Sequence, residues 1–270
     1  MTIAKGTQVY DVEHTPVIAR GLTFDDQELT HALDGPVSEV IRDDAGIDEL
    51  EALLVGVKET GFAPDAVKAV LVADGSLKDW RVGEALAEAY LTEHRRCMFP
   101  WPVSRDEKDP NASMPGADLV GFQDIDGEDR PKRFAFGEIK TSSQEAYPPS
   151  LMYGRHGMKS QLEDLRDSEP TRKALVVYLA HRAPGRDWEN HYRTAFGRYM
   201  QDSADVAVFG VMIRDVEPNI GDLRARSRSL ANGRPDAMVI ELYAIYLPVG
   251  SIAGIHSRIR LSQEGDHARN

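Results

Sequence analysis

The chain of 270 residues carries 32 Lys or Arg against 44 Asp or Glu, a formal net charge of -12 at pH 7, and 41% of its residues are hydrophobic. This length suits one large α/β domain with an appended region. A single cysteine, Cys97, excludes an internal disulfide and a multi-cysteine zinc site. The sequence lacks the apolar segment of a signal peptide or a membrane span, so we expect a cytoplasmic protein with no membrane partner.

The negative charge is concentrated near the N-terminus. Residues 1–60 hold 13 Asp or Glu and four Lys or Arg, whereas the remaining 210 residues hold 31 acidic and 28 basic side chains. Such an acidic region repels DNA or offers a docking surface to a basic protein, and a solvated acidic face is the competing interpretation. If it is a docking surface, we expect the acidic side chains within residues 43–51 to form part of it.

Residues 1–78 predict an acidic, mostly helical region. A short strand fits residues 15–19, and one or two helical turns fit residues 24–33. Residues 48–58 predict a helix with acidic side chains in its first turn, as the helix dipole favours. Residues 64–72 predict another helix, which begins near Pro64.

The next predicted helix runs from residue 79 to about residue 96. Its apolar stripe at helical spacing consists of Val82, Leu86, Ala89 and Tyr90. Glu84 and Glu88 stand four residues apart and therefore share one face of this helix. Prolines then recur through residues 97–117, which indicates an irregular loop.

Two apolar runs with a turn between them follow this loop. The first is GADLVGF at residues 116–122, and the second lies within FAFGEIKTSS at residues 134–143. Because Asp126-Gly127 stands in the polar segment between them, we expect a β-hairpin. Side chains alternate faces along a strand, so Glu138 and Lys140 point the same way, and the pairing brings Asp118 beside them.

Two carboxylates and one ammonium at the end of a hairpin indicate metal-dependent phosphodiester chemistry. Asp118 and Glu138 offer the hard oxygen ligands that Mg²⁺ or Mn²⁺ prefers. Lys140 then orients or activates the attacking water and offsets charge in the transition state. The sequence contains neither Gly-x-Ser-x-Gly nor Gly-x-x-x-x-Gly-Lys, so serine-hydrolase and intrinsic ATPase chemistry have no support.

Asp118 followed by Glu138-Ile139-Lys140 resembles the PD-(D/E)xK motif of restriction-endonuclease-like nucleases. Ala117 stands at the position of the motif's proline, although Pro115 lies nearby. The segments GADLVGF and GEIKTSS resemble the sequences of the nuclease subunits of the Hachiman anti-phage defence system, and the similarity covers about residues 80–260. This resemblance implies a DNA endonuclease or exonuclease that forms a complex with a superfamily 2 helicase, which controls its activity.

The resemblance also extends to supporting residues. Related nucleases take a glutamate from the helix before the first catalytic strand, which implies Glu84 as a further metal ligand, with Glu88 second; solvated helix carboxylates are the competing interpretation. Gln161, on a helix expected at residues 157–167, is similar to glutamines that position substrate or water. An exposed helical glutamine is the commoner meaning.

Further polar groups near this site are candidates for contact with phosphate. Thr141 and Ser142 either bind phosphate oxygens or cap the strand end. Basic side chains that could track phosphates beyond the catalytic strand are Arg155, His156, Lys159, Arg166, Arg172 and Lys173. Residues 174–180 fit a buried helix or strand, and their polar flanks favour the helix.

The remaining elements complete an expected α/β architecture. We expect a helix at residues 189–201, strands at residues 205–214 and 236–248, and a helix or strand at residues 249–261. The expected organisation is an acidic region at 1–78, a restriction-endonuclease-like core with a mixed sheet flanked by helices at 79–261, and a disordered tail at 262–270. The alternatives are a stand-alone restriction-type or repair nuclease, and a catalytically silent binding module for DNA or protein.

Overall fold

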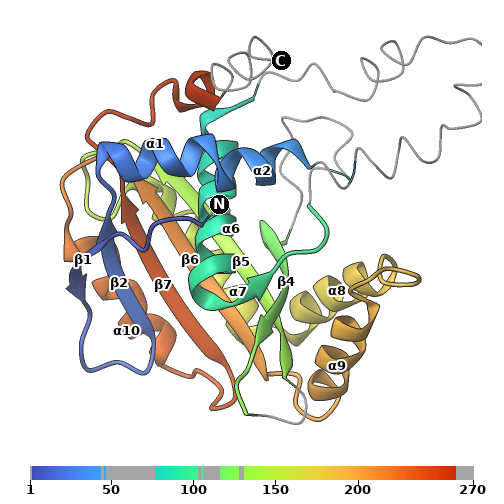
Figure 1. Cartoon of the computed structure of the whole chain (residues 1–270). Helices are drawn as coiled ribbons and strands as arrows, with labels where there is room; N and C mark the ends of the chain where they lie inside the picture. The colour runs from blue at the N-terminus through green and yellow to red at the C-terminus, as the bar shows by residue number, and fades with distance from the viewer. Residues whose placement is uncertain are drawn as a thin grey trace, which may run out of the picture.

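The computed structural model describes residues 2–43, 46, 77–102, 105, 116–127 and 131–259 (Figure 1). Its central element is a seven-stranded mixed sheet with the strand order β1-β2-β7-β6-β5-β4-β3. The strands are β1 (Thr7–Asp11), β2 (Ile18–Thr23), β3 (Cys97–Met98), β4 (Leu119–Asp124), β5 (Lys132–Ser142), β6 (Val206–Arg214) and β7 (Val239–Tyr246). Strands β2, β7, β6 and β5 run parallel to one another, and β1, β4 and β3 pair antiparallel with their neighbours.

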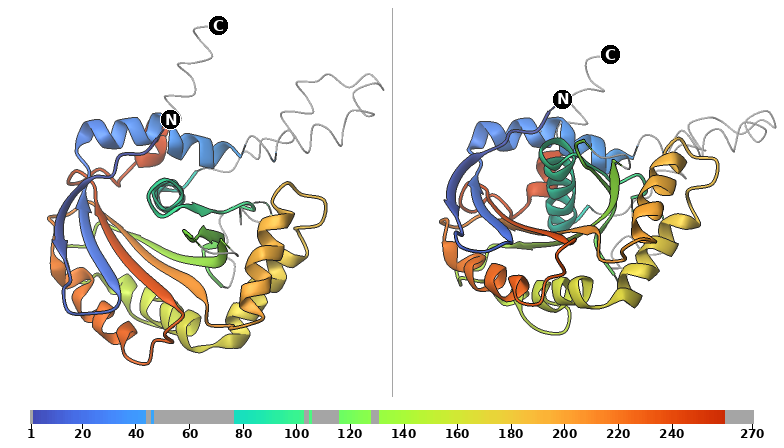
Figure 2. Two further views of the ribbon diagram at one scale, coloured as in Figure 1. Left: turned by 60° about the horizontal axis from the view of Figure 1, so that its bottom comes forward. Right: turned by 90° about the horizontal axis from the view of Figure 1, so that it is seen from below.

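Helices cover both faces of this sheet (Figure 2). On one side lie α1 (Asp26–Asp34), α2 (Pro36–Arg42) and α6 (Asp79–Arg95), and α6 packs over β5 and β6. On the other side lie α7 (Met158–Asp167), α8 (Glu169–Ala180), α9 (Glu189–Tyr199) and α10 (Arg224–Ala231). Two short 3₁₀ helices are η2 (Ser150–Met152) and η3 (Ile220–Asp222). All nine residues of β6 are buried, as expected for a strand covered on both faces.

The two faces of β5 belong to two separate apolar cores. Ala135 and Ile139 pack into the core beneath α6. Phe134 and Phe136 pack into the core beneath α7, α8 and α9. Because side chains alternate along a strand, Glu138 and the even-numbered positions after it face the α7 side of the sheet.

A buried arginine fixes the chain that leaves β5. Arg214 of β6 is fully buried, and its guanidinium donates hydrogen bonds to the backbone carbonyls of Ser142, Gln144 and Ala146, at 3.4, 2.7 and 3.0 Å. Asp222 balances its charge at 3.4 Å. Satisfying carbonyls and charge together allows this cation to stay inside the protein. The end of β5, which carries the candidate site, is thereby held in place.

Most elements predicted from residue 79 onward are confirmed. The hairpin is β4 paired with β5, and the helices expected at 79–96, 157–167 and 189–201 are α6, α7 and α9. The ambiguous residues 174–180 are helical, as their polar flanks indicate. The strands expected at 205–214 and 236–248 are β6 and β7. A short helical turn at residues 255–259 agrees with one of the two alternatives for the C-terminal segment.

The described part of residues 1–78 combines helices and strands: α1 corresponds to the helical turns expected at residues 24–33, and β2 overlaps the strand expected at residues 15–19. β1 and β2 extend the central sheet, and β2 pairs in parallel with β7. The helices expected at 48–58 and 64–72 and the tail at 262–270 lie outside the described residues. Within the described part of the chain, no helix combines the length and apolarity that a membrane crossing requires.

Candidate active site

The start of β4 places Asp118 against β5. The register of the two strands ends with Leu119 opposite Gly137, so Asp118 lies one position beyond the regular ladder. There its Oδ2 accepts a hydrogen bond of 2.7 Å from the backbone N–H of Ile139. The carboxylate thus takes the place of a strand carbonyl, and this contact fixes its orientation next to Glu138.

Glu138 and Lys140 lie together on the α7 face of β5. The Glu138 side chain is fully buried, and its Oε1 lies 2.5 Å from Nζ of Lys140, which is one-fifth exposed. On the next strand Glu138 stands opposite Gly210. A Cβ at Gly210 would meet Leu162 of α7 at 2.8 Å, so glycine lets α7 approach the sheet at this level. Within the group, Glu138 is the fully buried member, whereas Lys140 and Asp118 are partly exposed.

The electrostatics of the group reflect an excess of negative charge in a buried place. Burial, and then the charge of Asp118, raise the pKa of Glu138 to about 8, although Lys140 opposes this. Burial also raises the pKa of Asp118, against the effects of Lys140 and the Ile139 amide. For Lys140, burial lowers the pKa, but the charges of Glu138 and Asp118 outweigh it and raise the value overall. Near neutral pH the group therefore holds an extra proton, which a bound cation could replace.

These side chains fit a hard divalent cation. Oε2 of Glu138 is buried and has no hydrogen-bond partner among the described residues, although a buried carboxylate oxygen normally has one. Mg²⁺ is commonly held by one or two protein carboxylates and keeps several waters. Asp118 and Glu138 can supply the two carboxylates. Over the residues that the structure describes, no set of three or more His, Cys, Asp or Glu converges on one point.

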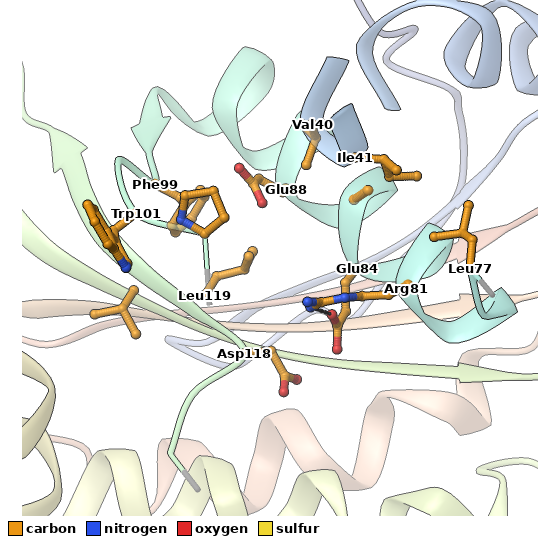
Figure 3. Close-up of a pocket in the computed structure, with 13 residues that line it drawn as sticks. Val40, Ile41, Leu77, Arg81, Glu84, Glu88, Phe99, Trp101, Asp118 and Leu119 are labelled. Carbon is orange, nitrogen blue, oxygen red and sulfur yellow. Dashed lines mark hydrogen bonds and ion pairs between the residues drawn. The ribbon is translucent and has the colours of Figure 1, made fainter. Parts of the chain in front are cut away.

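A small pocket opens beside Asp118 on the α6 side. It has a volume of about 120 Å³, and its lining includes Arg81, Glu84, Glu88, Phe99, Trp101 and Asp118 (Figure 3). In Figure 3 the side chain of Glu84 extends from α6 in the direction of Asp118, whereas Glu88 lies farther along α6 and farther from Asp118. β3 pairs only with the far end of β4, so this part of β4 is left open to the pocket.

Glu84 is held by Arg81, one helical turn earlier, through an ion pair of 2.8 Å. Its charge still contributes to the raised pKa values of Glu138 and Lys140. Glu84 therefore influences the site electrostatically without joining Asp118 and Glu138 in a three-ligand group of the described residues. Glu88 is half-buried, and burial, followed by the charge of Glu84, raises its pKa to about 8.

Of the side chains expected to contact substrate, some lie on the α6 face of the sheet and others on the α7 face. Thr141 lies on the α6 face, because a Cβ at Gly83 would meet its Oγ1 at 2.0 Å. The hydroxyl of Ser142 accepts a hydrogen bond of 3.2 Å from the amide of Gln144 and so caps the turn after β5. For Ser142 the capping alternative is thus the one observed.

The two candidates on α7 occupy the same side of the sheet as Lys140. Oε1 of Gln161 is buried and has no hydrogen-bond partner within the described ranges. Lys159 is half-buried near the start of this helix. Both remain available for contact with a ligand, and no measured contact links either of them to Asp118 or Glu138.

The expected phosphate-tracking cluster is divided between structural and exposed side chains. Arg166 donates to the backbone carbonyls of residues 229, 230 and 232 and pairs with Asp167. Arg172 is buried and donates to the carbonyls of Leu165 and Arg166. These two arginines close the ends of helices, so they do not form a free phosphate-binding surface. Arg155 and His156 are exposed.

The sequence interpretation missed a second group of residues, which surrounds Trp101. The guanidinium groups of Arg105, Arg182 and Arg186 lie 4.7, 5.7 and 5.2 Å from the centre of its ring. They come from two parts of the chain about 80 positions apart, so no local sequence pattern predicts that they cluster. Arg81 could have been found, because it precedes Glu84 by three positions on a predicted helix.

Comparison with known proteins assigns no family. No protein-family model matches the chain, and no curated protein matches its sequence at a significant level.

Proposed function

We propose that this protein is a metal-dependent phosphodiesterase that cleaves DNA, with Asp118 and Glu138 as metal ligands. The observation that carries the proposal is the fully buried Glu138, whose unpartnered Oε2 lies in a group with Asp118 and Lys140. A structural role explains this arrangement poorly, since burying an unsatisfied carboxylate is unfavourable. Perturbed acidic groups of this kind cluster at functional sites.

Each residue of the group has a distinct chemical role. A bound Mg²⁺ or Mn²⁺ would supply Lewis acidity and lower the pKa of a coordinated water. Asp118, oriented by the Ile139 amide, and Glu138 would hold that ion. Lys140 would place a positive charge beside the phosphate, which orients the attacking water and offsets the charge that develops on the phosphate oxygens.

The architecture supports the restriction-endonuclease-like assignment within this proposal. A helix, α6, precedes a hairpin that carries the acidic pair, and helices cover both faces of the mixed sheet. The acidic group lies where the hairpin meets the parallel strands β5 and β6. Fold alone does not define activity, so the assignment depends on the side chains of this site.

We further propose that the protein acts in anti-phage defence together with a superfamily 2 helicase. A chain of net charge -12 binds DNA weakly at physiological salt, since affinity grows with the number of phosphates neutralised. A helicase that travels on DNA would deliver the nuclease and restrain it, because tethering raises the local concentration. Asp43 is engaged by Arg105 within the chain, at 2.5 and 2.6 Å, which makes it a poor docking group. The other acidic side chains of residues 43–51 lie outside the described residues.

The test is a cleavage assay on circular and linear DNA with Mg²⁺, Mn²⁺ or excess chelator. We expect cleavage that depends on the metal, that is weak for the chain alone at physiological salt, and that a superfamily 2 helicase partner raises. Cleavage of the circular form would identify an endonuclease. Rapid cleavage by the chain alone would contradict the helicase proposal and favour a stand-alone nuclease. No cleavage with any metal or partner would favour a silent binding module.

A further inference from the structure

The pocket beside Asp118 has an aromatic and polar lining that metal binding by Asp118 and Glu138 does not require. One side is apolar and aromatic, with Phe99, Trp101 and Leu119. The lining also includes the polar side chains of Arg81, Glu84 and Glu88, which come from α6 (Figure 3). A volume of about 120 Å³ exceeds many times the ~10–15 Å³ that one water molecule requires. The pocket is thus large enough for a planar organic group and is lined to hold one.

The charges in the pocket favour a neutral ligand group over a phosphate. Glu84 and Asp118 are two acidic residues of its lining, and the charge of Arg81 is already paired with Glu84. Because Glu88 has a raised pKa of about 8, it is mostly protonated at pH 7 and can donate a hydrogen bond. A nucleobase offers a flat apolar face for the aromatic side and polar edges for the side of α6.

Positively charged side chains surround Trp101, one of the residues that line the pocket. Trp101 lines the pocket, and three guanidinium groups, those of Arg105, Arg182 and Arg186, lie against the same ring. Asp43 neutralises Arg105, while Arg182 also stacks on Tyr178 at 3.7 Å. Aromatic rings interleaved with arginines are typical of surfaces that bind single-stranded nucleic acid.

We propose that the pocket receives an unstacked base next to the phosphate being cleaved, while the arginines around Trp101 hold the adjacent backbone, so that the substrate is an unpaired DNA strand. This inference rests on the proposed function, because it takes Asp118 to mark the position of the phosphate. A base within a duplex is stacked and paired, and its extrusion into a pocket is energetically unfavourable. An unpaired strand avoids that penalty.

The experiment measures binding in excess chelator, so that the result does not depend on cleavage. The full-length chain is titrated at low salt, by fluorescence anisotropy, with a short labelled oligothymidine and with a strand of equal length that carries abasic sites. We expect the wild-type protein to bind the thymidine strand about tenfold more tightly, as the loss of one stacked base predicts. An unlabelled blunt duplex should compete poorly.

Variants distinguish binding of a base in the pocket from general electrostatic attraction to the DNA backbone. Trp101→Leu should abolish the difference between the two strands, and Trp101→Phe, which keeps a ring, should retain most of it. Trp80→Leu removes another tryptophan that contacts an arginine but does not line the pocket, and it should leave the difference unchanged. Arg182→Gln should weaken the binding of both strands equally, whereas Arg193→Gln, on the exposed part of α9, should have little effect.

Equal affinity of the wild-type protein for the thymidine and abasic strands would overturn the inference. A base preference that survives in Trp101→Leu would overturn it as well, and so would a duplex that competes as well as a single strand. Base-dependent binding without any metal-dependent cleavage would contradict the proposed function and overturn the placement of the base beside a cleaved phosphate, leaving only a base-binding pocket. Metal-dependent cleavage without base-dependent binding would support the proposed function and overturn this inference.

Discussion

The carboxylate of Asp118 accepts a hydrogen bond of 2.7 Å from the backbone amide of Ile139, the residue directly after Glu138 on the neighbouring strand. This single contact orients one acid relative to the other. Asp118 thus has two roles, to accept this hydrogen bond and to carry a negative charge. A substitution by asparagine separates them, because its carbonyl oxygen can accept the same hydrogen bond but the side chain carries no charge.

Asp118→Asn should therefore leave the fold nearly unchanged and suppress cleavage. We expect the free energy of unfolding to stay within about 1 kcal/mol of the wild-type value, since the hydrogen bond is kept. Loss of a charged metal ligand should lower the cleavage rate by about a hundredfold or more. Urea denaturation and a cleavage time course check the two parts. Wild-type activity in this variant would remove Asp118 from the site.

Glu138→Gln should stabilise the protein at high pH when chelator is present. The pKa of Glu138 is raised from 4.5 to about 8 in the folded chain, so the folded state binds more protons than the unfolded state between these values. The wild-type free energy of unfolding then falls as the pH rises through this window, and glutamine removes the effect. Above pH 8 we expect the variant to be more stable by about 5 kcal/mol, because the pKa rises from 4.5 to about 8 and each pKa unit corresponds to about 1.4 kcal/mol.

Near pH 4 the advantage of Glu138→Gln should vanish, because the wild-type carboxyl is protonated in the folded chain. The matched control is Glu93→Gln, which changes an exposed glutamate on α6 and should show no such dependence on pH. Denaturation curves across this pH range provide the measurement. A constant difference between Glu138→Gln and the wild type would rule out a raised pKa of Glu138.

Mn²⁺ should stabilise the wild-type protein through Asp118 and Glu138. A ligand that binds only the folded state adds about 2.7 kcal/mol at a concentration of 100 Kd. Thermal melting with and without Mn²⁺ reports this without any need for activity. Glu138→Gln should lose most of the shift, and Glu93→Gln should keep it. An equal shift in both variants would place the ion elsewhere.

Lys140→Ala should abolish cleavage while DNA binding in chelator persists. Removal of one group that stabilises transition-state charge lowers the rate by about 10²–10³-fold. A comparison variant is Lys159→Ala, which changes the half-buried candidate lysine near the start of α7. If Lys159 also positions substrate, its removal should weaken binding more than the rate at saturation. Full activity in Lys140→Ala would contradict the role assigned to this residue.

The hairpin and its acids could be predicted because their signals are local. Apolar runs flank Asp126-Gly127, and Gly127 adopts a φ of +69°, which suits a turn that glycine favours. Strand alternation then places Glu138 and Lys140 on one face. The same alternation also places Thr141 on the opposite face, so its location near α6 was available from the sequence.

Other features of the fold depend on contacts between residues far apart in the sequence, which no local pattern predicts. β2 joins the sheet through β7, more than 200 positions later in the chain, and its short sequence alone does not indicate parallel pairing. The hydrogen bonds of Arg166 and Arg172 to backbone carbonyls follow from the packing of α7 and α8, whereas a sequence shows only the charge of these side chains. The arginines around Trp101 likewise become neighbours only in the folded chain.

The most direct test of the central claim is anomalous diffraction from crystals of the protein soaked in Mn²⁺. We predict a peak between the carboxylates of Asp118 and Glu138, with Oε2 of Glu138 as a ligand and Nζ of Lys140 nearby. The same soak of Glu138→Gln should show no peak there. A wild-type crystal with no density between the two carboxylates, at Mn²⁺ concentrations that support cleavage, would contradict the central claim.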